Sequence, residues 1–192
     1  NGPIFPDTAA KGGQFVQLCN QIDIPIIFLH NITGFVVGKD FERAGQIKRG
    51  AQLLNSVSNS TVPHLTIILG ASYGAGTYAM SGRAYDNKFT FLWPTAKVAV
   101  MGPQQIAGVM SIVRRARAAR TGEKFDEKED AKMVAFAEKA QEEGSLALRA
   151  TGAISDDGII DPRDTRTVLG MCLSLVNGRN IEGSPGYGVY RL

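Results

Sequence analysis

Apolar and polar positions follow two distinct patterns along the first half of the chain. Ala9–Gln21 and Asp40–Ser60 carry apolar residues at spacings of three and four, which predicts helices with one buried face. Ile24–Asn31 and Leu65–Leu69 are unbroken apolar runs, typical of strands buried on both faces of a parallel sheet. Glycines bound Thr33–Gly38, which we expect to be a loop.

The second half continues with longer helices and short strands. Helical spacing predicts helices over Gln104–Arg120, Lys128–Ala150 and Asp164–Val176. Strands are expected at Phe89–Trp93, Lys97–Val100 and Ile159–Ile160, before a glycine-rich tail at Asn177–Leu192. The whole pattern predicts an α/β fold with a mainly parallel sheet, in one domain over residues 1–192. The opening NGPIFPD reads as the end of a turn, so we expect further sequence before Asn1.

Composition and charge narrow the possible partners. Apolar residues make up 44% and charged residues 20% of the chain, as in ordinary soluble globular proteins. A net charge of +3 is too small to indicate nucleic acid or an anionic membrane, and no apolar run approaches the roughly 18 residues that span a bilayer. Cys19 and Cys172 lie in apolar helical patterns, which indicates free thiols in a reducing compartment rather than a disulfide.

The segment Gly70–Met80 (GASYGAGTYAM) joins the second strand to a short helix expected at Gly76–Ser81. Its small residues let a ligand approach the backbone, and the first N–H groups of a helix have no acceptor within it. Such donors stabilise developing negative charge. Packing of small residues where a helix meets a sheet explains the same pattern, and these residues alone do not decide between the two.

The same segment contains a literal G-x-S-x-G match at Gly70–Gly74, in the strand–turn–helix context of a serine hydrolase nucleophile. That fold places its histidine after the serine in the chain. Here His30 and His64 both precede Ser72. We therefore expect no hydrolase unless another chain supplies the base.

Other candidate chemistry is sparse. The cysteines and histidines are scattered, so we expect no metal site, and there is no Walker-type loop or GxGxxG motif. One predicted helix carries a run of four arginines: Arg114, Arg115, Arg117 and Arg120. A solvated face is the preferred interpretation, and contact with an acidic partner or coenzyme A phosphates is the alternative. The mixed charges of Asp126–Glu143 indicate surface. Backbone donors without obvious acids or bases indicate a reaction that stabilises an oxyanion and takes its base from elsewhere.

Four blocks of sequence resemble the carboxyltransferase β subunits of biotin-dependent acyl-CoA carboxylases. The blocks are NITGFVVG (Asn31–Gly38), ASYGAGTYAMSGRAY (Ala71–Tyr85), FLWPTAKVAVMGPQQ (Phe91–Gln105) and IDPRDTRTVLG (Ile160–Gly170). They occur in the family's order over essentially the whole chain. The strings SYGAG-x-Y, GRAY, WP and VMG, with the tail YGVYRL, are most similar to the methylcrotonyl-CoA carboxylase type.

The resemblance implies a crotonase-like (ClpP/crotonase) α/β fold with repeated ββα units and flanking helices. Family β subunits hold two such domains, of which the N-terminal one mainly holds acyl-CoA and the C-terminal one mainly holds biotin. All four blocks match the C-terminal domain. Residues 1–192 are therefore expected to be this domain, with the N-terminal partner domain absent from the chain.

The resemblance further implies carboxyl transfer from carboxybiotin to a methylcrotonyl-CoA-like acyl-CoA, through an enolate and with biotin itself as the base. Carried over by position, the backbone N–H groups of Ala75 and Gly76 are the catalytic oxyanion donors for biotin. No metal is expected in this domain. The biotin pocket is expected at Gly34, Phe35, Val36, Tyr73 and Gly74.

The acyl pocket is expected at Thr77 and Tyr78, where the phenol of Tyr78 suits the methylcrotonyl type. Thr77 stands where that type often has Asn, and Pro103 stands where Gly is common, so the acyl group is left open. The alternative to a role of Tyr78 in the acyl pocket is that it is an aromatic residue of the hydrophobic core.

Several partners follow from the same resemblance: an N-terminal carboxyltransferase domain, a biotin carboxylase and biotin carrier subunit, and other β subunits in a hexamer. The small-residue face at Gly102–Met110 is a candidate interface. The location implied is the cytoplasm in a bacterium and the mitochondrial matrix in a eukaryote.

Two alternatives to a carboxyltransferase remain. One is a crotonase-type isomerase or hydratase, against which the lack of carboxylates in Gly74–Gly82 weighs. The other is a non-catalytic module that docks the biotin carrier, since the chain alone is expected to bind without turnover.

Overall fold

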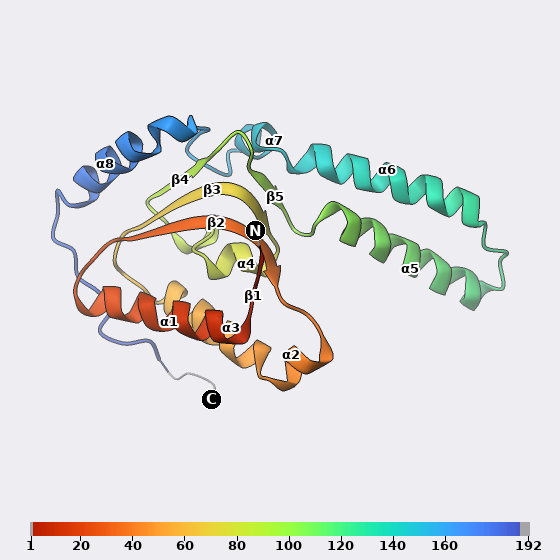
Figure 1. The fold of residues 1–192 in the computed structure, drawn as a ribbon, viewed down its shortest axis with the longest axis horizontal. Helices are drawn as coiled ribbons and strands as arrows, with labels where there is room; N and C mark the ends of the chain where they lie inside the picture. Colours follow the sequence, from red (N-terminus) through yellow and green to blue (C-terminus); the bar gives the residue numbers. More distant parts are fainter. Residues whose placement is uncertain (1, 189–192) are drawn as a thin grey trace.

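Five parallel strands form the sheet at the centre of the molecule (Figure 1). The computed structural model describes residues 2–188. Its strands are β1 (Gly2–Ile4), β2 (Ile26–Phe35), β3 (His64–Tyr73), β4 (Phe89–Leu92) and β5 (Lys97–Ala99). Their order is β1-β2-β3-β4, and β4 and β5 share one edge of β3, pairing with its first and second halves. Every pairing is parallel, which confirms the predicted α/β architecture.

Eight α-helices and two short 3₁₀-helices accompany the sheet within the described residues. The α-helices are α1 (Pro6–Gln21), α2 (Lys39–Arg43), α3 (Gln46–Ser58), α4 (Ala75–Ala79), α5 (Pro103–Thr121), α6 (Glu127–Ser145), α7 (Ala147–Gly152) and α8 (Thr165–Val176); the 3₁₀-helices are η1 (Arg83–Tyr85) and η2 (Pro162–Asp164). The pair α1 and α3 packs on the face of β2 that holds Ile26 and Phe28. On the opposite face, α8 packs against Leu65 of β3 and the phenylalanines of β4. A further cluster joins β3, β4 and α7.

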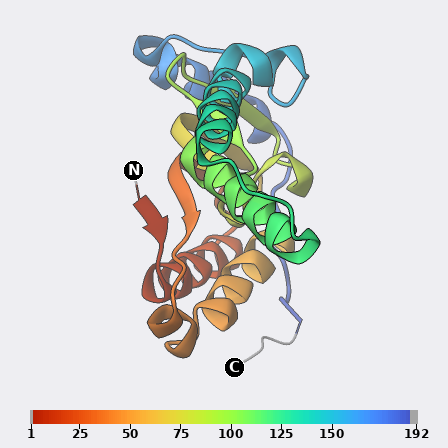
Figure 2. The ribbon, with the colours of Figure 1, turned by 90° about the vertical axis from the view of Figure 1, so that its right-hand side faces the viewer.

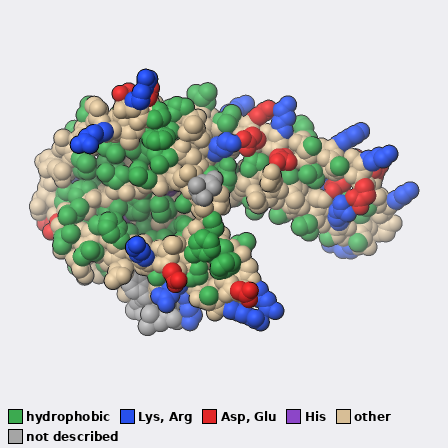
Figure 3. Space-filling view, in the orientation of Figure 1, with side chains coloured by type: hydrophobic (Ala, Val, Ile, Leu, Met, Phe, Trp, Pro, Cys, Tyr) green, Lys and Arg blue, Asp and Glu red, His purple; other side chains and the backbone are tan. Residues whose placement is uncertain are grey.

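The two central strands differ in how far their faces are covered. The first half of β3 is buried on both faces, as its unbroken apolar run predicts. The same prediction is wrong for β2, where Ile27 is 38% and Leu29 is 51% exposed. The reason is that α8 covers only β3 and β4 on that face. These two side chains and Phe15 of α1 line a hollow of about 260 Å³, and apolar side chains gather on this part of the molecule in Figure 3.

Several predicted elements have different bounds in the structure. The helix predicted over Asp40–Ser60 is two helices, because Gly45 at φ +88° turns the chain between α2 and α3. The helix predicted over Lys128–Ala150 breaks at Leu146, which is extended and pairs with Lys97 in an antiparallel bridge. The loop predicted at Thr33–Gly38 begins later, because β2 runs on to Phe35 beside the unpredicted β1.

The remaining predicted elements lie close to their expected places. The strand expected at Ile159–Ile160 is a single bridge between Ile159 and Leu92. The glycine-rich tail has no regular structure as far as Gly188, and its last four residues lie outside the described part of the chain. Between residues 2 and 188, no helix combines the length and apolar character needed to cross a membrane. Cys19 and Cys172 are both buried free thiols.

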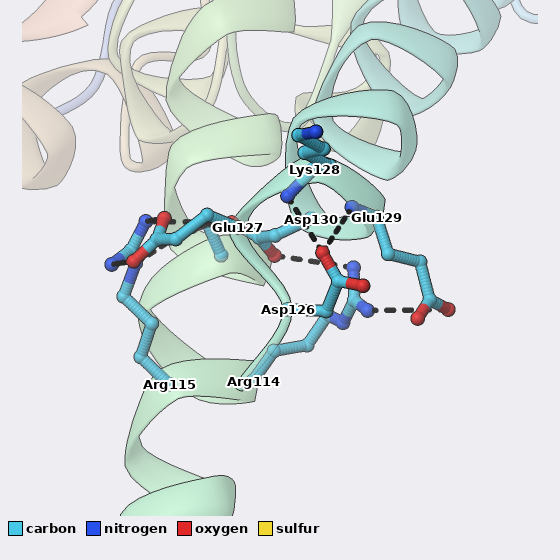
Figure 4. A network of polar contacts seen from close by, with 8 residues as sticks. Arg114, Arg115, Asp126, Glu127, Lys128, Glu129 and Asp130 are labelled. Carbon is cyan, nitrogen blue, oxygen red and sulfur yellow. Dashed lines mark hydrogen bonds and ion pairs between the residues drawn. The ribbon is translucent and has the colours of Figure 1, made fainter. Parts of the chain in front are cut away.

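Helices α5 and α6 form a hairpin arm that extends away from the sheet (Figures 1 and 2). Near its tip, Asp130 is 4% exposed, and its carboxylate accepts a hydrogen bond of 2.5 Å from the Ser111 hydroxyl. Arg114 lies 3.1 Å from the same carboxylate, and Arg115 makes a two-pronged pair with Glu127 at 2.6 and 2.8 Å (Figure 4). Two of the four arginines therefore bind acidic side chains of α6 within the arm, and Asp130 departs from the surface role expected of its segment.

We expect Asp130→Ala to lower the free energy of unfolding of the arm by about 2 kcal/mol. The change leaves Arg114 and Ser111 without their buried acceptor; the cost is below that of a fully buried pair because Arg114 is 34% exposed. Amide hydrogen exchange along α5 and α6 measures this loss of stability of the arm. The control is Glu143→Ala, which removes an exposed pair with Lys139 at 4.0 Å. Equal acceleration of exchange in both variants contradicts the prediction.

Candidate active site

The end of strand β2 and the start of helix α4 meet through two glycines, where the adjacent parallel strands β2 and β3 end. The chain leaves β2 at Phe35 and β3 at Tyr73. A Cβ atom on Gly76 would lie 3.0 Å from the Cα of Gly34 and 3.0 Å from the Cδ1 of Ile32, so the two backbones touch. Gly34 has φ +114°, a conformation that side chains rarely adopt. The structure thus brings together the two segments from which the site was predicted.

The start of α4 leaves backbone donors available. Gly74, at φ +61° and ψ −146°, turns the chain out of β3, and its N–H donates to the carbonyl of Ala99 at 3.0 Å. The N–H of Thr77 donates to the carbonyl of Gly74 at 3.1 Å. The N–H groups of Ala75 and Gly76 precede the first possible intrahelical acceptor, and no acceptor for them lies within residues 2–188. Ala75 is exposed and Gly76 is buried.

Each residue of the G-x-S-x-G match has a packing role. A Cβ atom on Gly70 would lie 2.5 Å from the side-chain oxygen of Asn31. The same oxygen accepts a hydrogen bond of 3.3 Å from the Ala71 N–H, at a place where the β2–β3 pairing is irregular. A Cβ atom on Gly74 would lie 3.1 Å from the carbonyl of Val100. Ser72 is fully buried. Without access to solvent it is no nucleophile, whatever base lies beside it.

A base does lie beside Ser72, and the prediction from chain order missed it. His30 Nδ1 is 2.9 Å from the Ser72 hydroxyl, and His30 Nε2 is 2.6 Å from the Met80 carbonyl. A carbonyl only accepts, so Nε2 carries the proton and Nδ1 accepts from Ser72. The Ser72 oxygen then accepts from the Thr77 hydroxyl at 2.9 Å. Burial, and not the order of residues in the chain, excludes the hydrolase.

A second buried histidine holds the chain just after α4. His64 Nδ1 is 2.8 Å from the hydroxyl of Ser81, a non-glycine residue at φ +61°. His64 Nε2 is 2.8 Å from Ser60, whose hydroxyl accepts from the Asn20 amide at 2.7 Å. The Ser81 carbonyl accepts from the Thr66 hydroxyl at 2.9 Å. These bonds hold Ser81 in its unusual conformation.

The other predicted site residues point in different directions. The ring of Phe35 packs on Gly50 in the core between β2 and α3, so this residue offers only its backbone to the loop. The hydroxyl of Thr77 points inward to Ser72. Tyr78 is 47% exposed, and its ring packs edge-on against the ring of Tyr85, with 6.1 Å between the ring centroids.

Tyr73 lies at the root of the arm. Its ring lies close to Gly102, which precedes α5, and near an ion pair between Lys97 of β5 and Glu142 of α6. Burial raises the pKa of the Tyr73 phenol; Lys97 opposes this shift and Glu142 adds to it. In the part of the chain that the structure describes, no group of three or more His, Cys, Asp or Glu side chains is placed to hold a metal ion.

A family model described as the carboxyl transferase domain matches residues 1–184. The chain belongs to this family. The probable biotin-dependent acyl-coenzyme A carboxylase beta2 subunit of Mycobacterium tuberculosis is 54% identical over 191 residues, covering 100% of this chain and 36% of that protein. The mitochondrial methylcrotonoyl-CoA carboxylase beta chain of Arabidopsis thaliana is 45% identical over 192 residues, covering 100% of this chain and 32% of that protein. The chain therefore spans about a third of the length of these curated relatives.

Solved structures give the same assignment. The beta subunit of P. aeruginosa geranyl-CoA carboxylase superposes with a TM-score of 0.85 at 44% identity, over 100% of this chain and 36% of that one. Transcarboxylase 12S superposes with a TM-score of 0.82 at 26% identity, over 99% of this chain and 35% of that one. The family and the crotonase-like fold predicted from the resemblance are confirmed. Within that fold the ββα order appears once, at β4–β5–α5.

The two buried histidines are the parts of this carboxyl transferase domain that reasoning from sequence missed. A signal was present for His30, which is a polar residue at the end of the apolar run Ile24–Leu29, at a position that the strand buries. Its pKa is lowered to about 4, mainly by burial, against the opposing hydrogen bond to Met80. The pKa of His64 is also lowered to about 4, by burial and then by the charge of Lys88. Both side chains are therefore neutral at pH 7.

The free energy of unfolding should fall as the pH drops from 6.5 toward 4. The unfolded chain takes up protons that the buried neutral histidines do not, so their stabilisation is complete above pH 6.5 and is lost on acidification. By about pH 5 the loss is about 2 kcal/mol for each histidine, measurable by urea unfolding at about pH 7.5 and about pH 5. His30→Gln and His64→Gln should each remove the part of this pH dependence that comes from the replaced histidine. A pH dependence as steep as that of the unaltered chain in both variants argues against the assignment.

Proposed function

We propose that this chain forms the biotin-facing half of a carboxyltransferase active site, in a biotin-dependent acyl-CoA carboxylase of the methylcrotonyl-CoA type. The reaction is transfer of a carboxyl group from carboxybiotin to an acyl-CoA. One observation carries the proposal: the backbones of Gly34 and Gly76 touch at the ends of two adjacent parallel strands, beside the unpaired N–H groups that begin α4. Ligands of open α/β sheets bind at this end of the strands.

The residues present fit the flat ureido ring of biotin. Gly34 and Gly76 carry no side chain, so their two backbones touch and no side chain of theirs stands between the end of β2 and the N–H groups that begin α4. Ala75 adds one methyl group at an exposed position. The N–H groups of Ala75 and Gly76 would hold the ureido oxygen, and the backbone of Gly34–Val36, with Tyr73 and Gly74, would line the pocket.

Biotin, when bound on its carrier, supplies the carboxyl group and the base. What remains for this chain is to stabilise negative charge on the ureido oxygen with donors fixed in advance. Two backbone N–H groups achieve this without any side-chain acid or base. The alternative of a crotonase-type isomerase or hydratase lacks support in the same place, because Gly74–Gly82 contains no carboxylate.

Tyr78 is the residue that we propose limits the acyl group. It is exposed on the first turn of α4, three residues after Ala75, and its edge-on contact with Tyr85 fixes the ring. Thr77, predicted beside it, turns its hydroxyl inward to Ser72, so we assign Thr77 a lesser part in the acyl pocket. A methylcrotonyl-like branched acyl group remains the proposed substrate class.

Further partners complete the proposed site. They are an N-terminal carboxyltransferase domain that holds acyl-CoA, a biotin carboxylase with its biotin carrier, and other β subunits. The solved transcarboxylase 12S is described as a hexamer assembly, and we propose a hexamer here. The name of the Arabidopsis relative places that protein in mitochondria, and we propose the mitochondrial matrix or the bacterial cytoplasm for this one.

Ala75→Pro tests the donors directly. Proline has no N–H, and Ala75 occupies the first helical position, where proline is tolerated. Gly74 before it already has an extended mirror-image conformation that accepts a following proline. In a complete β subunit carrying this sequence, we expect carboxylation of acyl-CoA to fall by about 100- to 1000-fold, the usual cost of one oxyanion donor.

The matched control is Ala75→Gly, which keeps the N–H and should retain activity within about threefold. Circular dichroism and thermal unfolding of both variants establish that they fold. A folded Ala75→Pro subunit that carboxylates acyl-CoA at the normal rate contradicts the proposed function.

Tyr78→Ala should relax selectivity among acyl-CoA substrates. Removing the phenol opens the proposed pocket, so kcat/KM for a bulkier acyl chain should rise relative to a short one by about tenfold, the value of one or two methylene groups. Competition between two acyl-CoAs in the complete subunit measures the ratio. Tyr78→Phe keeps the ring and should leave the ratio unchanged; an unchanged ratio in the alanine variant removes Tyr78 from the acyl pocket.

A further inference from the structure

One chain of hydrogen bonds holds the middle and the C-terminal end of the helix that carries the proposed donors. It starts at the Thr77 hydroxyl, within α4, and passes through Ser72 on β3 to His30 on β2. It ends at the carbonyl of Met80, the residue that follows α4. The three contacts measure 2.9, 2.9 and 2.6 Å. His30 and Ser72 are both fully buried.

The direction of this chain is fixed at every step. The Met80 carbonyl requires a proton on His30 Nε2, so His30 Nδ1 accepts from Ser72, and Ser72 accepts from Thr77. Each donor meets one acceptor. Replacing His30 by an apolar residue would remove the acceptor of the buried Ser72 hydroxyl and the donor to the half-buried Met80 carbonyl, which lowers stability.

The helix needs such support because it is short. A five-residue helix has almost no stability of its own, so its place is set by tertiary contacts. Ala79 is fully buried and Gly76 packs on Gly34, which fix one side of α4. The hydrogen bonds through His30 fix the position along the axis, since they hold Thr77 in the middle of α4 and Met80 just past its end.

We propose that His30 is a positioning residue for carboxyl transfer, which sets the direction of the Ala75 and Gly76 N–H groups by tying Thr77 and Met80 to the sheet. This inference rests on the proposed function, because it concerns the donors named there. Oxyanion donors act through their position, and small displacements of catalytic groups reduce rates strongly.

The test compares three variants in a complete β subunit that carries this sequence, with a biotinylated carrier and acyl-CoA. His30→Leu removes both hydrogen bonds at similar volume, and kcat should fall about 10- to 100-fold with KM for acyl-CoA changed by less than about twofold. His30→Gln offers one acceptor and one donor, and should restore kcat to within about threefold. Leu65→Ala is the control for lost stability, since Leu65 is 1% exposed on the same strand as Ser72 and its side chain belongs to the core cluster with α8 and β4.

Leu65→Ala should lower the melting temperature at least as much as His30→Leu while kcat stays within about twofold. A normal kcat in folded His30→Leu, or an equal loss of kcat in Leu65→Ala, overturns the positioning role. If His30→Leu does not fold, Ser72→Ala and Thr77→Val break the same chain at smaller side chains, and kcat must fall in both. Amide exchange of Thr77 and Met80, whose N–H groups donate to the carbonyls of Gly74 and Gly76 at 3.1 Å, gives a readout without turnover in the 192-residue chain, and both should exchange faster in the broken variants than in Leu65→Ala.

The outcomes separate this inference from the proposed function. An inactive Ala75→Pro subunit with a fully active His30→Leu subunit overturns the positioning role and leaves the proposed function standing. An active, folded Ala75→Pro subunit overturns the proposed function itself, whatever His30 does.

Discussion

The backbone contact between Gly34 and Gly76 constrains the rest of the structure. Gly76 has room for no Cβ, because Gly34 and Ile32 lie 3.0 Å from where it would be. This contact requires β2 and β3 to be neighbours that run in parallel, so that the end of β2 meets the helix that follows β3. The core between β2, α1 and α3 holds β2 in place, and α8 with β4 holds β3. The sheet can therefore be understood as the support that brings two glycines together.

The parts of the fold that depend on local pattern could be predicted from the sequence. The apolar run of β3 and the helix α8 lie close to where periodicity puts them, whereas the loop predicted over Gly70–Gly76 is reduced to Gly74, because β3 continues to Tyr73 beside β5. What the pattern missed depends on contacts distant in sequence. Leu146 is extended because it pairs with Lys97, and β1 exists only because it adds to the edge of β2. The exposure of Leu29 could not be foreseen either, since it reflects how far across the sheet α8 reaches.

In the candidate site, too, features set by local sequence could be predicted and features set by distant contacts could not. The glycines and the donors at Ala75 and Gly76 were predicted, because a loop between strand and helix is visible in the sequence and a family resemblance assigned its role. His30 was discounted because it precedes Ser72 by 42 residues. Parallel pairing of β2 with β3, with an irregularity between His30 and Ile32, places it beside the serine all the same. Order along the chain excludes a catalytic pair only within one known fold, whereas the burial of Ser72 keeps a substrate from its hydroxyl in this structure.

A site made of backbone donors transfers the need for precision to residues that never touch the ligand. A side chain can adjust its rotamer, but an N–H group points where its peptide plane points, so it is aimed only by fixing the helix that carries it. Neutral histidine suits this role because, buried in the sheet, it donates with one nitrogen and accepts with the other, and so connects Ser72 to the carbonyl of Met80. A lysine or carboxylate there would bring a charge into a dry interior, at a far greater cost than a neutral ring with both nitrogens paired. The lowered pKa of His30 is thus a consequence of the same burial that lets it hold α4 without adding charge beside the proposed oxyanion site.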